Sequence, residues 1–135
     1  MTQQDTPATK GSILLIDDDK FLLDMYGMKF SQAGHTVEAC LSANEALTTL
    51  RGGFQPDVIL FDLTMPELDG FSFLKALSDE HLAGNSIKIA LTNQSDESEK
   101  EKAAELGAAR YIVKASMIPS EVVNTVHEEL AKHRA

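Results

Sequence analysis

Two features that are scarce in this sequence narrow the class of protein it can be. Cys40 is the only cysteine, so no disulfide can form within the chain and no oxidising compartment is required. No apolar run approaches the roughly 20 residues that a membrane-spanning helix needs. Residues 1–11 are polar and lack the apolar stretch of a signal peptide. We therefore expect a cytoplasmic protein with a flexible N-terminal tail over 1–11.

Basic residues are also few. The 12 Lys and Arg stand against 21 Asp and Glu, which gives a net charge of −9. Binding to nucleic acid needs clustered basic residues, so neither DNA nor RNA is an expected partner, and no membrane is expected either. The acidity suits the binding of cations or of basic protein surfaces. The length of 135 residues fits a single domain, which we place at 12–133.

Short apolar runs alternate with helical patterns along the chain. Strands are predicted at 13–16, 36–41, 58–61, 87–91 and 111–113. Helices are predicted at 20–32, from a capping box at Ser42 to about 52, at 70–79, at 95–106 and at 119–132. Continuous rather than alternating hydrophobicity predicts strands that are buried on both faces. Five successive strand–helix units predict an α/β fold, with a parallel sheet between two layers of helices.

Acids, a hydroxyl and an amine follow the predicted strands. Open α/β sheets bind ligands beyond the carboxyl ends of their strands, and the residues at those ends are Asp17, Asp18, Asp62, Thr92 and Lys114. Three neighbouring carboxylates repel one another, and a divalent cation relieves the repulsion. Oxygen ligands favour Mg²⁺, with Mn²⁺ as a substitute. A carboxylate beside such an ion can attack phosphorus, while the amine and the hydroxyl stabilise the phosphoryl oxygens.

Four segments of the chain resemble the receiver domains of two-component response regulators. They are 13–19 (ILLIDDD), 57–70 (DVILFDLTMPELDG), 89–92 (IALT) and 107–114 (GAARYIVK). The Asp-x-x-Met-Pro-x-x-Asp-Gly pattern is the most specific of them, and the likeness extends over roughly 12–132. It implies a flavodoxin-like, doubly wound fold, in which a five-stranded parallel sheet of order 2-1-3-4-5 is surrounded by five helices.

The resemblance also implies a metal site and a phosphorylation site. Asp62 would accept the phosphoryl group. Mg²⁺ would be bound by Asp18 and Asp62, by Asp17 largely through water, and by the backbone carbonyl of Thr64. Lys114 would contact the phosphoryl group. Asp19, which follows Asp17 and Asp18 in the sequence, is predicted only to cap the next helix.

A conformational switch is implied as well. Thr92 would move towards the phosphoryl group, and Tyr111 would rotate inwards to fill the space that it leaves. Thr64, Asn93 and Gln94 occupy positions that modulate the lifetime of the aspartyl phosphate in this family. Partners would dock on the face formed by helix 4, strand 5 and helix 5.

Two residues depart from the pattern of the family. Asn93 stands where a very small residue is usual, and Ala115 stands where proline in a cis peptide is usual. A cis bond before a residue other than proline costs about 2.5–4 kcal/mol, so we expect the bond between Lys114 and Ala115 to be trans. These departures leave an alternative open, a pseudo-receiver that binds proteins independently of phosphorylation.

The function expected from these patterns is that of a single-domain response regulator. It would accept a phosphoryl group from a histidine kinase or a phosphotransfer protein, and it would catalyse only its own phosphorylation and dephosphorylation. A flavin-binding protein is disfavoured because three acids would repel the flavin phosphate. A metal-dependent phosphatase is disfavoured because no Asp-x-Asp pair is recognised as nucleophile and acid, and because the chain has no extra residues for a substrate cap. The histidines lack the spacing of metal ligands and are predicted to lie on the surface: His35, His81, His127 and His133.

Overall fold

Five parallel strands form one sheet in the computed structural model, which describes residues 11–93 and 95–134. The strands are β1 (Ser12–Ile16), β2 (Thr36–Cys40), β3 (Val58–Asp62), β4 (Ile87–Thr92) and β5 (Ala108–Val113). Their order across the sheet is β2-β1-β3-β4-β5, which confirms the order that the resemblance implied. The predicted tail, up to residue 10, and the predicted modulator Gln94 lie outside the described residues.

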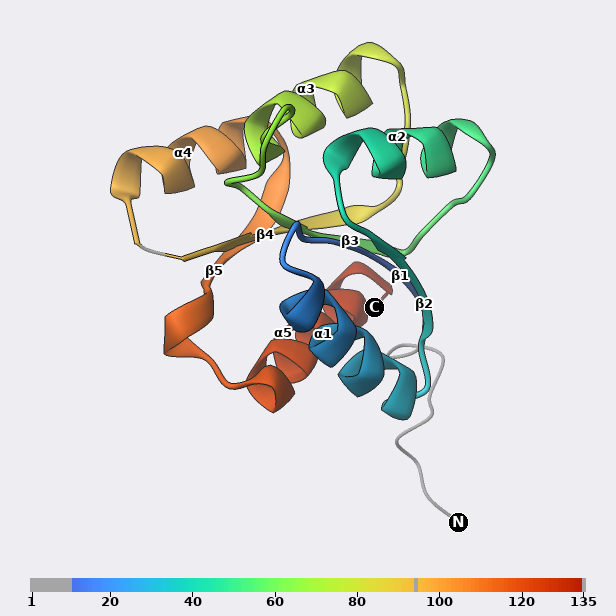
Figure 1. The fold of residues 1–135 in the computed structure, drawn as a ribbon, viewed down its shortest axis with the longest axis vertical. Helices are drawn as coiled ribbons and strands as arrows, with labels where there is room; N and C mark the ends of the chain where they lie inside the picture. The colour runs from blue at the N-terminus through green and yellow to red at the C-terminus, as the bar shows by residue number, and fades with distance from the viewer. Residues whose placement is uncertain (1–10, 94, 135) are drawn as a thin grey trace.

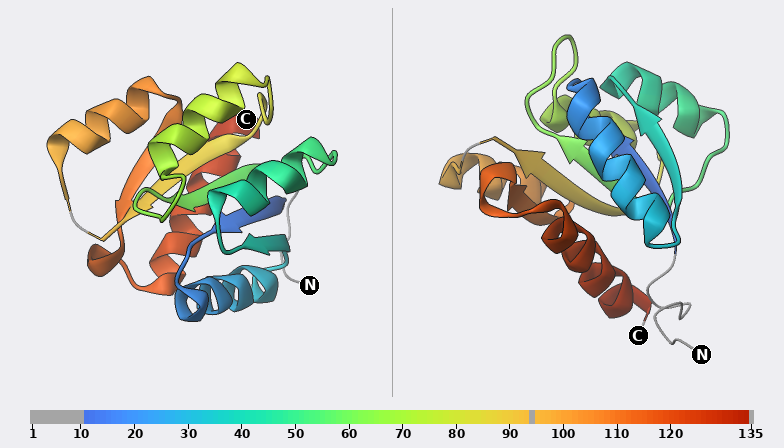
Figure 2. Two further views of the ribbon diagram at one scale, coloured as in Figure 1. Left: turned by 45° about the horizontal axis from the view of Figure 1, so that its top comes forward. Right: turned by 60° about the horizontal axis from the view of Figure 1, so that its bottom comes forward.

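Helices cover both faces of the sheet. They are α1 (Lys20–Gln32), α2 (Ala43–Arg51), α3 (Gly70–Asp79), α4 (Glu97–Glu105) and α5 (Pro119–Arg134), with a short 3-10 turn, η1 (Lys114–Ser116), before α5. Helices α1 and α5 lie side by side on one face, and α2, α3 and α4 lie on the other (Figures 1 and 2). No helix among the described residues is long and apolar enough to cross a membrane.

The middle strand is buried along its whole length. Val58 and Leu60 on β3 face the layer of α1 and α5, whereas Ile59 and Phe61 face the layer of α2 and α3, because successive residues of a strand point to opposite faces. Burial of each such side chain stabilises the fold by about 1.5–3 kcal/mol. The strand is therefore held on both sides, and Asp62 at its end is held with it.

Side chains that cap the helices set where the helices begin. Asp19 accepts hydrogen bonds from the backbone N–H groups of Phe21 and Leu22, which confirms that this acid caps α1. The predicted helix at 95–106 is shorter than expected at both ends. It begins at Glu97 because the side chain of Asp96 accepts the N–H groups of the first helical turn.

The prediction that all four histidines lie on the surface is wrong for His35, which is only 6% exposed. Its ring packs against Phe30 and contacts His127 of α5. His127 is itself half-buried, whereas His81 and His133 are exposed as expected. Phe30 is near His35 in the sequence, but His127 is 92 positions further along, and no local pattern predicts that contact.

Candidate functional site

Three carboxylates meet at the carboxyl ends of two neighbouring strands. Asp17 directly follows β1, and Asp62 ends β3, which pairs with β1. One carboxylate oxygen from each of Asp17, Asp18 and Asp62 lies within 4.8 Å of the others. Asp17 and Asp62 are buried, whereas Asp18 is exposed. The acids that the sequence indicated as metal ligands are thus brought together, at a place that solvent reaches on the side of Asp18.

The ammonium of Lys114 lies between two of these acids. Its Nζ is 2.7 Å from Asp17 Oδ2 and 3.3 Å from Asp62 Oδ2, and its side chain is 9% exposed. Burial acts to lower the pKa of Lys114, but the bonds and charges of Asp17 and Asp62 outweigh it and raise the pKa. The side chain therefore stays charged. None of the described peptide bonds is cis, so the trans bond expected between Lys114 and Ala115 is confirmed, and the lysine reaches the acids all the same.

The protein's own groups leave the charge of Asp62 only partly compensated. Burial raises the pKa of this carboxyl group, and the charge of Asp17 raises it further. Lys114 and the N–H of Thr64, which donates to Asp62 Oδ1 at 3.1 Å, lower the pKa without cancelling the effect of burial. A divalent cation would supply the missing positive charge, and a donor set made of carboxylate oxygens fits Mg²⁺.

Gly70, the first residue of α3, holds the loop that follows Asp62. Its N–H donates to the carbonyl of Leu63 at 2.9 Å. A Cβ at this position would lie 2.8 Å from both the carbonyl oxygen of Asp62 and the Cα of Leu63, so only glycine fits the approach without a shift of the backbone. The sequence placed Gly70 in the most specific motif but gave it no role, and the aspartate–glycine pair at the end of that motif was the available signal.

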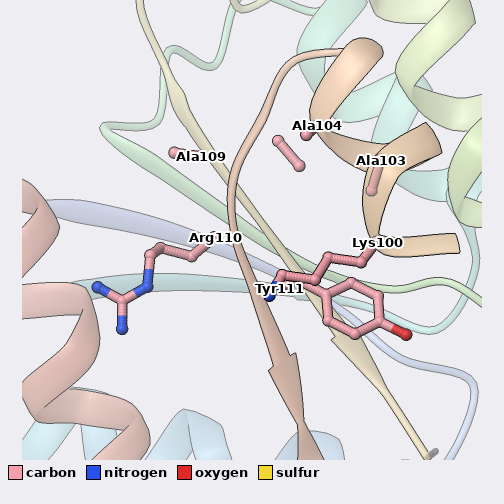
Figure 3. Close-up of a pocket in the computed structure, with 7 residues that line it drawn as sticks. Lys100, Ala103, Ala104, Ala109, Arg110 and Tyr111 are labelled. Atoms are coloured by element: carbon pink, nitrogen blue, oxygen red, sulfur yellow. The ribbon is translucent and has the colours of Figure 1, made fainter. Parts of the chain in front are cut away.

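The two predicted switch residues lie on neighbouring strands. Thr92 ends β4 and is 2% exposed, one residue beyond Leu91, which is level with Asp62 on β3. Tyr111 is half-buried on β5. Its side chain lies on the α4 side of the strand, opposite that of Arg110 (Figure 3), and lines a pocket of about 390 Å³ between α4 and β5. Tyr111 is thus outside the acid cluster, and its switching role remains a prediction.

Of the predicted modulators, Thr64 and Asn93 lie among the described residues. The N–H of Thr64 binds Asp62, whereas the role of its carbonyl as a metal ligand remains a prediction. Asn93 follows Thr92 and is exposed.

Comparison of the sequence with known proteins identifies a matching family model and several relatives. The family model described as response regulator receiver domain matches residues 13–127. The chain is 31% identical over 120 residues to the response regulator SaeR of Staphylococcus epidermidis, covering 89% of this chain and 50% of that protein. It is 30% identical over 112 residues to the gliding motility regulatory protein of Myxococcus xanthus, covering 82% and 14%. The chain therefore spans half or less of the length of these relatives.

Solved structures show the same likeness over nearly their whole length. A CheY-like receiver domain protein from Methanospirillum hungatei superposes with a TM-score of 0.81 at 27% identity, covering 91% of this chain and 95% of that one. The chemotaxis protein CheY4 of Vibrio cholerae gives a TM-score of 0.81 at 26% identity, covering 88% and 98%. The receiver domain of the Francisella response regulator 1452 gives 0.79 at 29% identity, covering 93% and 99%.

Proposed function

This chain belongs to the receiver domain family of response regulators, and on that premise we propose that it accepts a phosphoryl group on Asp62 in a reaction that needs Mg²⁺. The donor would be a histidine kinase or a phosphotransfer protein. The observation that carries the proposal is the convergence of Asp17, Asp18, Asp62 and Lys114 at one edge of the sheet. The Mg²⁺ would be held by the three carboxylates.

Asp62 is better placed than Asp17 to act as the nucleophile. Both oxygens of Asp17 are engaged at short distance, by the N–H of Asp19 at 2.9 Å and by Lys114 at 2.7 Å. The contacts of Asp62 are longer, at 3.1 Å and 3.3 Å. Burial also raises the pKa of Asp62, and a more basic carboxylate is a stronger nucleophile once it is ionised.

The proposed reaction is a direct transfer of the phosphoryl group. A carboxylate oxygen of Asp62 attacks phosphorus, a bond from oxygen to phosphorus forms, and the bond from phosphorus to the donor's imidazole nitrogen breaks. The imidazole leaves with the electron pair of that bond. Negative charge on the phosphoryl oxygens is stabilised by the ammonium of Lys114 and the hydroxyl of Thr92. Bound Mg²⁺ would neutralise part of the same charge.

Mass spectrometry tests this proposal directly. After incubation with acetyl phosphate and Mg²⁺, the intact protein should gain about 80 Da, the mass of one phosphoryl group. Asp62→Asn should show no gain, and the surface variant Asp79→Asn should behave like the unmodified sequence. If no adduct forms with acetyl phosphate or with histidine kinases and phosphotransfer proteins from the source cell, the alternative of a phosphorylation-independent binding module is favoured.

Signalling would then proceed through a partner protein. We propose that the partner docks on the face formed by α4, β5 and α5, where Tyr111 lines the pocket beside α4. The chain would work in the cytoplasm and would catalyse only its own phosphorylation and dephosphorylation.

A further inference from the structure

Two histidines join β2 to α5 at the end of the sheet opposite the acid cluster. His35 precedes β2, and His127 lies on α5. Their Nε2 atoms are 2.8 Å apart, and their ring centroids are 5.0 Å apart. One hydrogen bond therefore connects the two rings, between residues that are 92 positions apart in the sequence.

A second contact fixes where the protons lie. The Nδ1 of His35 is 3.1 Å from the backbone carbonyl oxygen of Gly11. Because a carbonyl only accepts, this Nδ1 carries a hydrogen, and the Nε2 of a neutral His35 is an acceptor. His127 must then donate its Nε2–H. A single proton thus lies between the two Nε2 atoms.

This arrangement can take up one positive charge but not two. A proton added to Nδ1 of His127 leaves the hydrogen bond between the rings intact. If both rings are protonated, both Nε2 atoms carry a hydrogen, although the distance between them leaves room for only one. The two positive charges also repel at this distance. Burial, and after it the charge of His35, lowers the pKa of His127.

Among the described residues, groups near the pair come from several parts of the fold. Helix α1 contributes the ring of Phe30, whose centroid is 5.7 Å from that of His35. The residue before β1 contributes the carbonyl of Gly11. On α5, the acids that follow His127 pair with other groups. Glu129 contacts Arg110 of β5 at 3.0 Å, Lys132 at 3.4 Å and His133 at 3.6 Å, and Glu128 contacts Arg110 at 3.6 Å.

We propose that His35 and His127 form a clasp that holds one proton and opens in acid, releasing α5 from the amino end of β2. The rest of α5 stays attached, because Val122, Val126 and Leu130 are buried in the core and the pair of Arg110 and Glu129 ties the helix to β5. Opening the clasp therefore loosens one side of the helix. The proposal does not depend on the phosphoryl chemistry at Asp62.

The direction of the pH effect follows from linkage. The folded protein binds the second proton less readily than the unfolded chain, whose histidines titrate near pH 6.5. The stability that the clasp contributes is therefore complete above this pH and is lost as the pH falls below it. The equilibrium constant for unfolding should rise by up to about tenfold per pH unit for each proton that the folded state excludes.

Urea unfolding between pH 7.5 and 5.5 tests the clasp. His127→Gln keeps an N–H donor near His35 but cannot take up a proton. Over this interval, the factor by which its unfolding constant rises should therefore be about ten times smaller than the factor for the unmodified sequence. His81→Asn is the matched control, since His81 is exposed and has a positive φ that asparagine tolerates. It should keep the full pH dependence. Equal pH dependence in His127→Gln and in the unmodified protein would refute the clasp.

A second measurement decides the matter if the glutamine variant does not fold. Nitrogen NMR of the imidazole rings in the unmodified protein should show His35 protonated on Nδ1 and His127 protonated on Nε2 at pH 7.5. On acidification, amide hydrogen exchange should increase in α5 around His127 more than in β3. Independent titration of both rings near the ordinary histidine pKa, with no change in exchange, would exclude the clasp.

Discussion

Replacing Lys114 by methionine removes the ammonium that joins Asp17 and Asp62, while a side chain of similar length stays in place. At separations of 2.7 Å and 3.3 Å, the two attractions amount to about 6 and about 5 kcal/mol for an effective dielectric constant of about 20, before the cost of desolvation is subtracted. Most of this attraction is offset by the cost of removing Lys114, Asp17 and Asp62 from water. Removing one partner of a buried ion pair costs about 3–5 kcal/mol. We therefore expect Lys114→Met to lower the free energy of unfolding by that amount when divalent cations are absent.

The loss should shrink when Mg²⁺ is present. A divalent cation among the three carboxylates would replace the charge that the variant lacks, and a ligand that binds only the folded state stabilises it by mass action. In the unmodified protein the ammonium already neutralises part of the charge on Asp17 and Asp62. Mg²⁺ should therefore raise the free energy of unfolding of Lys114→Met by more than that of the unmodified protein. Urea unfolding in EDTA and in Mg²⁺ measures both quantities.

A matched surface pair provides the control. Lys75 contacts Asp79 at 3.2 Å, but the two side chains are 70% and 60% exposed. Lys75→Met should therefore cost less than about 1 kcal/mol and should not respond to Mg²⁺. The reasoning would be refuted if Lys114→Met cost no more than Lys75→Met, or if its loss were the same with and without Mg²⁺.

Two further substitutions test the surroundings of Asp62. Gly70→Ala should lower the free energy of unfolding by about 1–3 kcal/mol and slow phosphorylation by acetyl phosphate, because the new Cβ would lie 2.8 Å from the Asp62 carbonyl oxygen; Gly84→Ala, where a Cβ meets nothing within 4 Å, should change the rate little. Asp62→Asn should raise the free energy of unfolding at pH 7, because burial raises the pKa of this carboxyl and the folded state is penalised for ionising it. The gain should disappear below about pH 4, where the carboxyl group is protonated in the unfolded chain as well. Urea unfolding at pH 7 and pH 3 measures the effect, and no gain in the free energy of unfolding at pH 7 would contradict the raised pKa.

The parts of the site that lie at strand ends were predictable because parallel strands end at a common edge. Asp17 and Asp62 each follow an apolar run, and that local pattern suffices to place both at the same edge. The alternation of strands and helices likewise predicted the layers of the fold. What the residue pattern alone left open was the order of the strands, which depends on which crossovers the chain makes and came from the family resemblance.

The features that the sequence did not predict depend on distant contacts. The ring of buried His35 contacts His127, 92 residues further along, and no local periodicity predicts such a contact. The close approach of Gly70 to the Asp62 carbonyl depends on how α3 returns to β3. The sequence around Lys114 likewise did not indicate that its Nζ would lie nearer to Asp17 than to Asp62.

That last distance bears on how phosphorylation and metal binding are connected in the proposed function. A phosphoryl group on Asp62 would attract Lys114 away from Asp17, which is buried and is paired with the lysine at 2.7 Å. Leaving that carboxylate without a positive charge would cost several kcal/mol. A divalent cation held by the three acids would remove this cost, so the proposed metal would let Lys114 turn to the phosphoryl group without leaving Asp17 uncompensated. The requirement for Mg²⁺ would thus follow from the position of Lys114 as well as from the charge of the phosphoryl group. The trans bond before Ala115 does not weaken this coupling, because the ammonium still lies 3.3 Å from Asp62.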